Sequence, residues 1–517
     1  MQTIGRPLLD RADRAANAVY TWKYNPLYHT GALAVCAFLV LLVTGLYLLL
    51  FYRISSPYGS VEGLAAQWWG GRWIRSLHRY ASDLAIVAIV IHAVRMFLQG
   101  RTWGPRALAW LSGLVLTAVF LVCGWTGYVM VWDQHGQLIA QEGARIMDAL
   151  PLFGEPIRRT FGGEYAIPNA FFFLNLFAHI LLPVGVGLVL WIHVSRLART
   201  YWMPPRALFW GTVGLFVFVS AAWPAPIGAP ADLLRTPGLV PFDVLYGFWL
   251  PLTRTMEPGT VWLAGLALVA VLASVPFLMR PPPEKAPPVS WVNPRFCTGC
   301  EQCYLDCPYE AIQMVARDDG RAELVGVVDP AKCVSCGICA GSCAPMGVGP
   351  IGRTGRDQLT DVRTFIEREK PGADDIVIVG CHNAVAGGGT GDLHGALPFE
   401  VSCAGSVHTS VIEYLVRAGA GGVLLATCPP RDCWNREGVA WMEERIYNER
   451  EAELKDRVDR RRLRVLYAGA GESHLLRAEL QRFRAQMQAL ERALGEREIQ
   501  IDDTCEVPVP SNVEELR

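Results

Sequence analysis

The chain has 517 residues, 52% of them hydrophobic, and its mean hydropathy of +0.25 is too high for an ordinary soluble enzyme. Charge is divided unevenly: residues 1–280 carry a net charge of +8 on 32 charged side chains, whereas residues 281–517 carry −9 on 63. A membrane half followed by a soluble half explains this contrast. The sequence disfavours nucleic-acid binding, because no basic stripe with interleaved aromatic residues occurs and the soluble half is acidic.

Six apolar stretches are long enough for transmembrane helices, which need about 20 residues to cross the hydrocarbon core. They are residues 30–51, 80–98, 107–131, 170–195, 206–223 and 259–279. An even number of spans places both termini on one side. Cytoplasmic loops are enriched in Lys and Arg, and the loop charges favour the cytoplasm for that side, although the Arg-rich segment 53–79 opposes the trend. The sequence predicts a multi-pass protein of the cytoplasmic membrane with cytoplasmic termini and a cytoplasmic soluble half.

Four histidines lie within these spans at matched spacing. His78 and His92 share one span, and His179 and His193 share another. Each pair is 14 residues apart, so its members share one helix face about 21 Å apart. Two such helices side by side offer two stacked bis-imidazole sites, which suit two b haems. A lone intramembrane histidine would be interpreted as an interhelical hydrogen-bonding residue, but four at one spacing favour haem ligation.

Four glycines repeat with the same period on the other two of the first four spans. They are Gly31 and Gly45 on the first span and Gly113 and Gly127 on the third. Glycine weakens a helix, so a repeat in register with the histidines needs a steric reason. We interpret the glycines as bare backbone against which a flat macrocycle packs; small residues for helix–helix contact are the alternative.

On these histidine and glycine pairs, and on the run Gly127-Tyr128-Val129, residues 17–200 resemble the haem-binding four-helix part of cytochrome b from the bc and bf complexes. The resemblance implies membrane quinone as the substrate, a homodimer, and an outer quinol site near the amphipathic stretch 136–150. It also implies two axial pairs, His78 with His179 on the outer side and His92 with His193 on the cytoplasmic side.

The family's quinol-site motif, Pro-Glu-Trp-Tyr, is altered in this chain. The nearest match is Pro241-Phe242-Asp243-Val244, in which the acid is shifted by one residue. Asp243 is a candidate acceptor for a quinol proton, because that step requires a carboxylate of adjustable pKa. The alternative is a loop aspartate that caps a short helix. No Rieske-type Cys/His pair accompanies the motif, so the resemblance does not extend to quinol bifurcation.

Beyond a stiff Pro-rich spacer, residues 281–291, two cysteine runs follow the pattern C-x2-C-x2-C-x3-C. In two-cluster ferredoxins the fourth cysteine of each such run binds the other cluster. The pattern therefore predicts two [4Fe–4S] sites, one at Cys297, Cys300, Cys303 and Cys343 and the other at Cys333, Cys336, Cys339 and Cys307. Structural zinc, which favours two well-separated C-x2-C pairs, and disulfides, which need an oxidising compartment, are disfavoured.

The remaining chain alternates between short apolar runs and helical patterns, which predicts a small parallel α/β sheet. The predicted strands are 376–379, 422–426 and 463–467, and the predicted helices lie near 407–418, 438–459 and 474–496. Four cysteines stand at the ends of these elements: Cys381, Cys403, Cys428 and Cys433. Four thiolates at one sheet edge fit a [2Fe–2S] cluster, with zinc as the competitor.

The stretches 379–381, 402–405 and 428–433 resemble the delta subunit of methyl-viologen-reducing hydrogenase, with Pro-Pro-Arg where that family has His-Pro-Gly. This resemblance implies a cytoplasmic partner of hydrogenase, formate dehydrogenase or heterodisulfide reductase-like flavoprotein type, docked on residues 353–517.

We therefore expect a multi-domain chain: an α-helical membrane bundle, an α+β ferredoxin-like domain and a small α/β domain. The expected segments are 1–205 (dihaem four-helix domain), 206–280 (two further helices), 281–291 (linker), 292–352 (two-cluster domain) and 353–517 (α/β iron–sulfur domain). The predicted function is electron transfer between a cytoplasmic oxidoreductase and membrane quinone, with substrate catalysis in a separate subunit. A membrane anchor for a soluble oxidoreductase and a redox sensor are the rival hypotheses.

Overall fold

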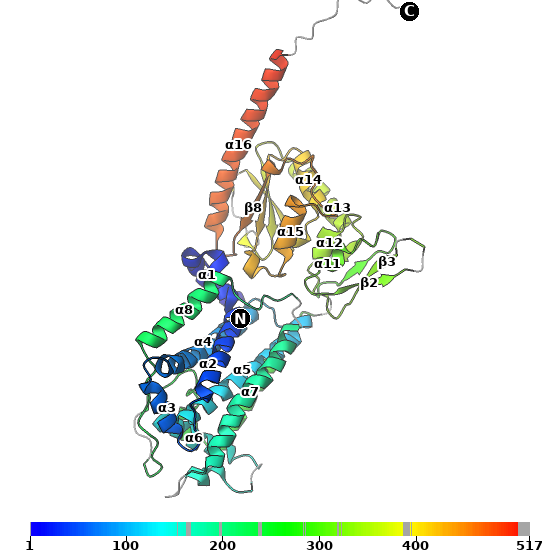
Figure 1. Ribbon diagram of the computed structural model, residues 1–517. Helices are drawn as coiled ribbons and strands as arrows, with labels where there is room; N and C mark the ends of the chain where they lie inside the picture. Colours follow the sequence, from blue (N-terminus) through cyan, green and yellow to red (C-terminus); the bar gives the residue numbers. More distant parts are fainter. Residues whose placement is uncertain are drawn as a thin grey trace, which may run out of the picture. The chain divides into compact units, whose positions relative to one another are not determined.

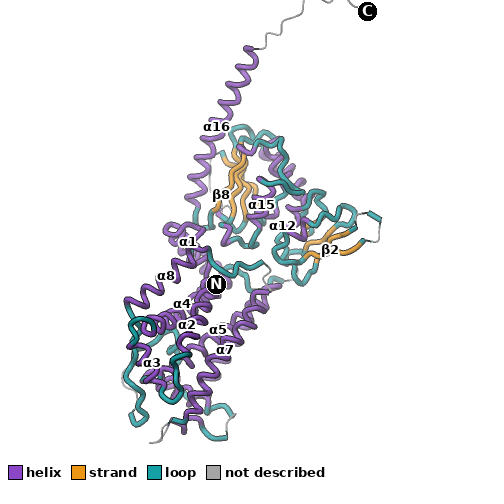
Figure 2. The backbone as a smooth tube through the Cα atoms, viewed as in Figure 1, coloured by secondary structure: helices purple, strands orange, loops and turns teal. Residues whose placement is uncertain are grey.

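The computed structural model describes residues 2–151, 154–161, 167–195, 199–235, 240–282, 284, 286–317, 320–321, 323–385, 393 and 395–504. Positions 283 and 285 of the predicted linker lie outside the described residues. The chain divides into two compact units, Met1–Ala286 and Pro287–Arg517, which are described separately. Figure 2 shows the helical character of the first unit and the strands of the second.

The first unit is a helical bundle (Figure 1). Its helices are α1 (Gln2–Tyr24), α2 (Thr30–Leu49), α3 (Pro57–Ala66), α4 (Gly71–Leu98), α5 (Ala107–Val131), α6 (Gln134–Met147), α7 (Asn169–Ser195), α8 (Arg206–Ala222), α9 (Leu250–Thr255) and α10 (Pro258–Leu278). Helix α2 packs along α4, and α5 packs along α7. Within the described residues α4 and α7, which carry the histidines, make few direct contacts with each other.

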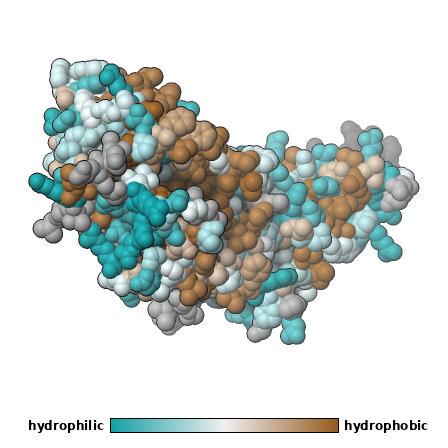
Figure 3. Space-filling model, turned by 90° about the horizontal axis from the view of Figure 1, so that it is seen from below, coloured by the Kyte–Doolittle hydropathy of each residue, from teal (hydrophilic) through white to brown (hydrophobic). Residues whose placement is uncertain are grey.

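Five helices of the described chain are long and apolar enough to cross a membrane: α2 with the 3-10 turn before it, α4, α5 with the turn before it, α7 and α10. The predicted span at 206–223 is the 17-residue helix α8, about 25 Å long, so it is shorter than the roughly 30 Å hydrocarbon core. Large apolar side chains such as Val43 and Leu263 are about 70% exposed. Figure 3 shows apolar residues over much of the face drawn. The chain is an integral membrane protein.

Helix α1 is anchored to α4 by a buried ion pair. Arg95 is 3% exposed, and its two terminal nitrogens donate to the two carboxylate oxygens of Asp13 at 2.6 and 2.9 Å. Because both side chains are hydrogen-bonded to each other, the charge of Arg95 near the end of the apolar helix α4 is compensated although it is buried. The ion pair neutralises the charge of Arg95, so this residue does not contribute to the excess of positive charge near the helix ends.

The second unit begins with a ferredoxin-like part that contains two antiparallel strand pairs. Strand β1 (Ser290–Val292) pairs with β4 (Val348–Pro350), and β2 (Ile312–Ala316) pairs with β3 (Leu324–Val328). Two short helices, α11 (Gln302–Leu305) and α12 (Ile338–Ser342), each carry one cysteine of a predicted cluster-binding run.

The rest of this unit is a parallel sheet with helices on both faces. The strands lie in the order β6 (Ala396–Val401), β5 (Ile376–Cys381), β7 (Gly422–Thr427) and β8 (Leu463–Tyr467). Apolar residues of α13 (Gly355–Glu369), α14 (Thr409–Arg417) and α15 (Gly438–Tyr447) cover one face, and those of α16 (Ser473–Thr504) cover the other (Figure 1). The predicted fold class is confirmed. Helix α15 ends at Tyr447, earlier than the predicted helix, and neither α13 nor β6 was predicted.

Candidate haem and iron–sulfur centres

The membrane bundle brings the outer pair of predicted ligands face to face. The ring centres of His78 on α4 and His179 on α7 are 6.4 Å apart, with 53° between the ring planes. This separation leaves room for one metal ion between the two rings, since metal–imidazole bonds are about 2 Å long, and the two imidazoles would then hold a haem iron. The second pair, His92 and His193, lies on the same two helices, 14 residues further along each. The residues of the first pair therefore fit a bis-histidine haem, and a second haem between His92 and His193 stays a prediction.

Each of the four predicted ligand histidines is contacted by a hydroxyl on the neighbouring helix. The contacts to histidine Nδ1 are Thr44 to His78 (2.9 Å), Thr126 to His179 (2.9 Å), Ser112 to His193 (3.1 Å) and Thr30 to His92 (3.4 Å). Three of these hydroxyls also donate their single proton to a carbonyl one turn back: Thr44 to Val40, Ser112 to Leu108 and Thr126 to Val122.

A hydroxyl whose proton is committed to a carbonyl acts as an acceptor toward the imidazole. We therefore assign the ring proton to Nδ1, which leaves the Nε2 lone pair free to bind iron. The hydroxyl residues were missed at the sequence level. Their signal is the Thr/Ser-Gly dipeptide, which recurs at all four glycines of the 14-residue repeat.

The four glycines lie opposite the same four rings. A Cβ at Gly45 would be 3.3 Å from His78 Cε1, and the same distance is 3.2 Å for Gly31 to His92, 3.4 Å for Gly113 to His193 and 3.3 Å for Gly127 to His179. Such distances are tighter than ordinary carbon contacts. The steric reason seen here is thus the imidazole ring, which lies against bare backbone beside the hydroxyl that orients it; packing against the macrocycle stays a prediction.

Replacing Thr44 by Val is expected to loosen the outer haem and raise its midpoint potential, because the lost hydrogen bond makes His78 a weaker donor to iron. Outer partners of this kind commonly contribute about 10- to 100-fold in metal affinity. Haem retention in detergent and an optical redox titration measure both effects. Thr117→Val is the matched control, since Thr117 on α5 bonds the carbonyl of Gly113. Equal shifts of both haems would contradict the assignment.

Replacing Gly45 by Ala is expected to displace the His78 ring by a few tenths of an ångström and to reduce haem content at the outer site, with Gly45→Val reducing it further. Gly185→Ala on α7 is the control, because no atom lies within 4 Å of its added Cβ. Optical spectra of the purified variants report the haem content. Wild-type content in Gly45→Val would show that this close approach has no role.

A hydrogen-bonded network of Arg79, which follows His78 in the sequence, Tyr128 and Asp243 joins α4, α5 and the loop before α9. Arg79 donates to Asp243 at 2.7 Å and to the Tyr128 hydroxyl at 2.5 Å, and Tyr128 in turn donates to the same carboxylate. The other oxygen of Asp243 accepts from the backbone N–H of Leu245 (2.8 Å) and Tyr246 (3.0 Å). Burial raises the pKa of Asp243, but these hydrogen bonds and Arg79 outweigh burial and lower the pKa below its ordinary value. The backbone N–H groups of Leu245 and Tyr246 belong to a turn, not to a helix, because the next helix, α9, begins only at Leu250.

The ring of His135, at the start of α6, lies 4.5 Å from the ring of Tyr128, centre to centre. Burial lowers the pKa of His135, with Asp133 and Asp243 opposing the effect and Arg79 adding to it. This histidine was not singled out from the sequence. It adds a second titratable group beside Asp243.

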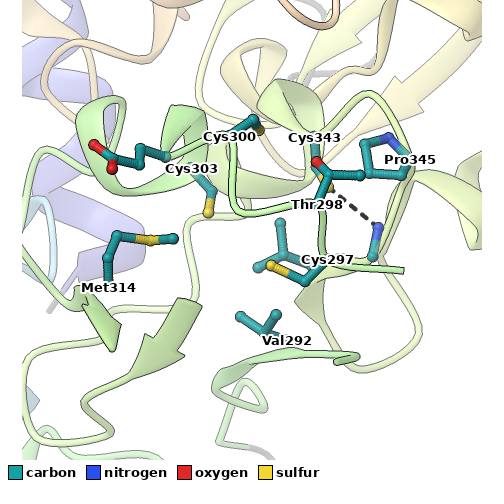
Figure 4. A pocket seen from close by; sticks show the side chains of 11 residues that line it. Val292, Cys297, Thr298, Cys300, Cys303, Met314, Cys343 and Pro345 are labelled. Carbon is teal, nitrogen blue, oxygen red and sulfur yellow. Dashed lines mark hydrogen bonds between the residues drawn. The ribbon is translucent and has the colours of Figure 1, made fainter. Parts of the chain in front are cut away.

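In the second unit, a pocket is lined by the four cysteines predicted for one [4Fe–4S] site, Cys297, Cys300, Cys303 and Cys343. Figure 4 shows them around one space together with Val292 and Met314. Burial and then neighbouring thiols, the other three of this set among them, raise the pKa of Cys303. Cys336 similarly has the other three cysteines of the second predicted set, Cys307, Cys333 and Cys339, as electrostatic neighbours. The pocket thus brings the first predicted set together, and the crossed assignment of both sets stays a prediction.

The two cysteine runs have the same backbone conformation. Gly299 and Ser335, each two residues after the first cysteine of its run, have φ of 72° and 58°, and Glu301 and Gly337, each two residues later, have φ of 62° and 77°. The backbone N–H four residues after the last cysteine donates to its sulfur in both runs, from Ala311 to Cys307 (3.3 Å) and from Gly347 to Cys343 (3.2 Å). Hydrogen bonds to sulfur stabilise the reduced form of a cluster. The segment is therefore built as two equivalent halves.

The last four predicted ligands also come together, at one end of the parallel sheet. The Cys381 and Cys428 sulfurs are 3.7 Å apart, and Cys403 and Cys433 complete a ring of interacting thiols. Hydrogen bonds from Cys403 and Cys428 lower the pKa of Cys381. All four are buried. Among the described residues no three His, Cys, Asp or Glu side chains surround one point as a single metal ion requires.

Three segments match known families. Residues 17–201 match cytochrome b/b6/petB, residues 296–347 match a 4Fe-4S dicluster domain, and residues 394–491 match the delta subunit of methyl-viologen-reducing hydrogenase. Among solved structures, a chain of a "Hyperthermophilic respiratory Complex III" is similar at 18% identity and a TM-score of 0.40, over 49% of this chain and 75% of that one.

The family matches coincide with the two kinds of centre described above. The first covers all four histidines, and the second covers all eight cysteines of the paired runs. The third begins after Cys381 but includes Cys403, Cys428 and Cys433. The chain is therefore a membrane electron-transfer protein with haem b and [4Fe–4S] centres, a fusion of a cytochrome b-type membrane domain, a 4Fe-4S dicluster domain and a hydrogenase delta-subunit domain.

Proposed function

We propose that this chain is the membrane subunit of a respiratory-type, quinone-linked complex. Electrons pass between a cytoplasmic oxidoreductase and membrane quinone through one [2Fe–2S] cluster, two [4Fe–4S] clusters and two b haems. When bound, these groups supply one-electron chemistry, and the protein holds and orients their ligands. The observation that carries the proposal is the set of four imidazoles, each oriented by a hydroxyl and three of them thereby assigned a free Nε2.

The partner subunit supplies substrate catalysis in this proposal. The domain of hydrogenase delta-subunit type supports a partner of hydrogenase, formate dehydrogenase or heterodisulfide reductase-like flavoprotein type. That partner docks on residues 353–517, on the cytoplasmic side. The membrane domain then acts as a homodimer that exchanges electrons with quinone.

Anaerobic purification followed by metal and haem analysis tests the proposal. We expect two b haems and about ten non-haem iron atoms per chain, together with a dithionite-induced change in absorption. Zinc in place of the two-iron cluster would restrict the electron path to the paired cysteine runs and the haems. Fewer than two haems would contradict the membrane part of the path.

The Asp243→Asn variant tests the role of the carboxylate at the outer end of the bundle. Because the pKa of Asp243 is lowered, its charge and ion pair are fully present at neutral pH and are lost only as pH falls through that lowered value. Loss of the ion pair with Arg79 should therefore reduce quinone-linked activity by a similar factor from pH 5 to 8. A lost limb of the pH–rate profile would instead identify Asp243 as the quinol proton acceptor.

A further inference from the structure

A fully buried cation joins two iron–sulfur ligand loops of the second unit. Arg445 on α15 is 1% exposed, and its guanidinium donates to the Ser342 hydroxyl at 2.8 Å and to the Gly405 carbonyl at 2.6 Å. Ser342 directly precedes Cys343, and Gly405 lies two residues after Cys403. One side chain thus ties the ferredoxin-like part to the α/β part at the places where both bind iron.

The charges around Arg445 leave an excess of one positive charge. Asp306, fully buried directly before Cys307, lies 4.0 Å from Arg445 and 2.5 Å from Arg450, and it accepts a hydrogen bond from Ser342 at 2.6 Å. Two guanidinium groups therefore share one carboxylate. A buried excess charge is costly unless it is compensated.

Cluster thiolates would provide that compensation. Burial lowers the pKa of Arg445 to about 10, and Asp306, Cys403 and Cys339 oppose this effect, the two cysteines coming from the two different ligand sets. Iron–sulfur clusters bound by four thiolates are anions, and each becomes more negative by one charge when it is reduced. A cation buried between two such clusters stabilises both reduced forms.

The same two ligand loops approach one glycine. A Cβ at Gly438 would lie 3.4 Å from the Cys403 sulfur and 3.4 Å from Ile338, which directly precedes Cys339. A Cβ at Gly405 would lie 2.5 Å from the Gly438 Cα, so this contact requires glycine. The backbones at Gly405 and Gly438 are thus in close contact at the place where the ligand sets of Cys339 and Cys403 approach each other.

We propose that Arg445 is the positioning residue of the electron crossing between the [4Fe–4S] and the [2Fe–2S] site, and that its charge raises the reduction potential of both. In the crossing one electron leaves one cluster, which is oxidised, and enters the other, which is reduced, with no atom transferred. The inference rests on the proposed function, because it assumes clusters at the two ligand sets: Cys307, Cys333, Cys336 and Cys339, and Cys381, Cys403, Cys428 and Cys433.

Redox titration of the anaerobically purified full chain, followed by electron paramagnetic resonance, tests this. Arg445→Gln removes the charge, Arg445→Lys keeps it, and Arg482→Gln, whose side chain is 76% exposed in wild type, is the control. We expect Arg445→Gln to lower both midpoint potentials and slow the transfer between clusters. Arg445→Lys should stay close to wild type, and the control should not change.

Arg450→Gln provides a second test that does not depend on the most buried position. Arg450 is 15% exposed, and its loss leaves Arg445 as the partner of Asp306, so the fold should tolerate the change. Both potentials should shift downward by less than in Arg445→Gln. Unchanged potentials in Arg450→Gln, or equal shifts in Arg445→Gln and Arg445→Lys, would overturn the inference. Absence of a [2Fe–2S] signal from the wild-type chain would overturn the proposed function itself.

Discussion

Replacing His92 by Ala is expected to remove one b haem and abolish quinone-linked electron transfer, while the other haem and the iron–sulfur centres remain. The two groups that contact the His92 ring, the Thr30 hydroxyl and the backbone at Gly31, carry no imidazole that could replace it. Without this histidine, a haem at that position would have only one protein ligand and should bind weakly. Haem content should fall to about half, with unchanged iron–sulfur signals.

His474→Ala provides the control for this variant, because His474 lies exposed on α16. Co-purification of the soluble partner with the His92→Ala chain must be shown, so that lost activity is not confused with lost assembly. Full quinone-linked activity in the His92→Ala chain would support the rival hypothesis, in which the chain serves as an anchor. Lost activity with retained assembly excludes the anchor as the whole function.

Replacing Cys343 by Ala is expected to destroy the cluster of the first cysteine run, although Cys343 belongs to the second run. The reason is the pocket that Cys343 shares with Cys297, Cys300 and Cys303. About four iron atoms should be lost, and the spectrum of the remaining clusters should match that of a Cys300→Ala chain.

The reciprocal variant completes the test. Cys307→Ala should reproduce the spectrum of Cys336→Ala, since these two cysteines interact in the other set. Cys36→Ala is the control, because Cys36 is buried on α2 in the membrane unit. If Cys343→Ala instead resembles Cys336→Ala, each run binds its own cluster and the crossed assignment is wrong.

Spacing alone predicted the haem histidines, because two residues 14 apart must share a face of any α-helix. The hydroxyls of Thr44, Ser112 and Thr126 were missed for a physical reason. A threonine in an apolar helix normally bonds its own backbone, and only the three-dimensional structure shows that the same oxygen also meets an imidazole.

In the second unit, too, some elements were predicted from the sequence and others were not. Two of the three predicted strands, 376–379 and 422–426, are continuous apolar runs, which buried parallel strands require. The third, 463–467, contains Arg464 and lies at an edge of the sheet. Strand β6 was missed because Pro398 interrupts an alternating pattern, and such a proline is tolerated only because β6 is at the edge of the sheet. The burial of Arg445 could not be predicted, since its helix is rich in Arg and Glu, a pattern that is typical of a solvent-exposed helix face.

The hydroxyl and the glycine that contact each histidine come from one neighbouring helix, and this has a consequence for assembly of the membrane domain. Thr44 and Gly45 on α2 support His78 on α4, and the corresponding groups on α5 support His179 on α7. Each helix pair can thus prepare its own imidazoles before the other pair is in place. Bound haem would then join two helix pairs that are already formed. In cells starved of porphyrin, the membrane domain should therefore accumulate as two helix pairs that separate easily and are sensitive to proteolysis.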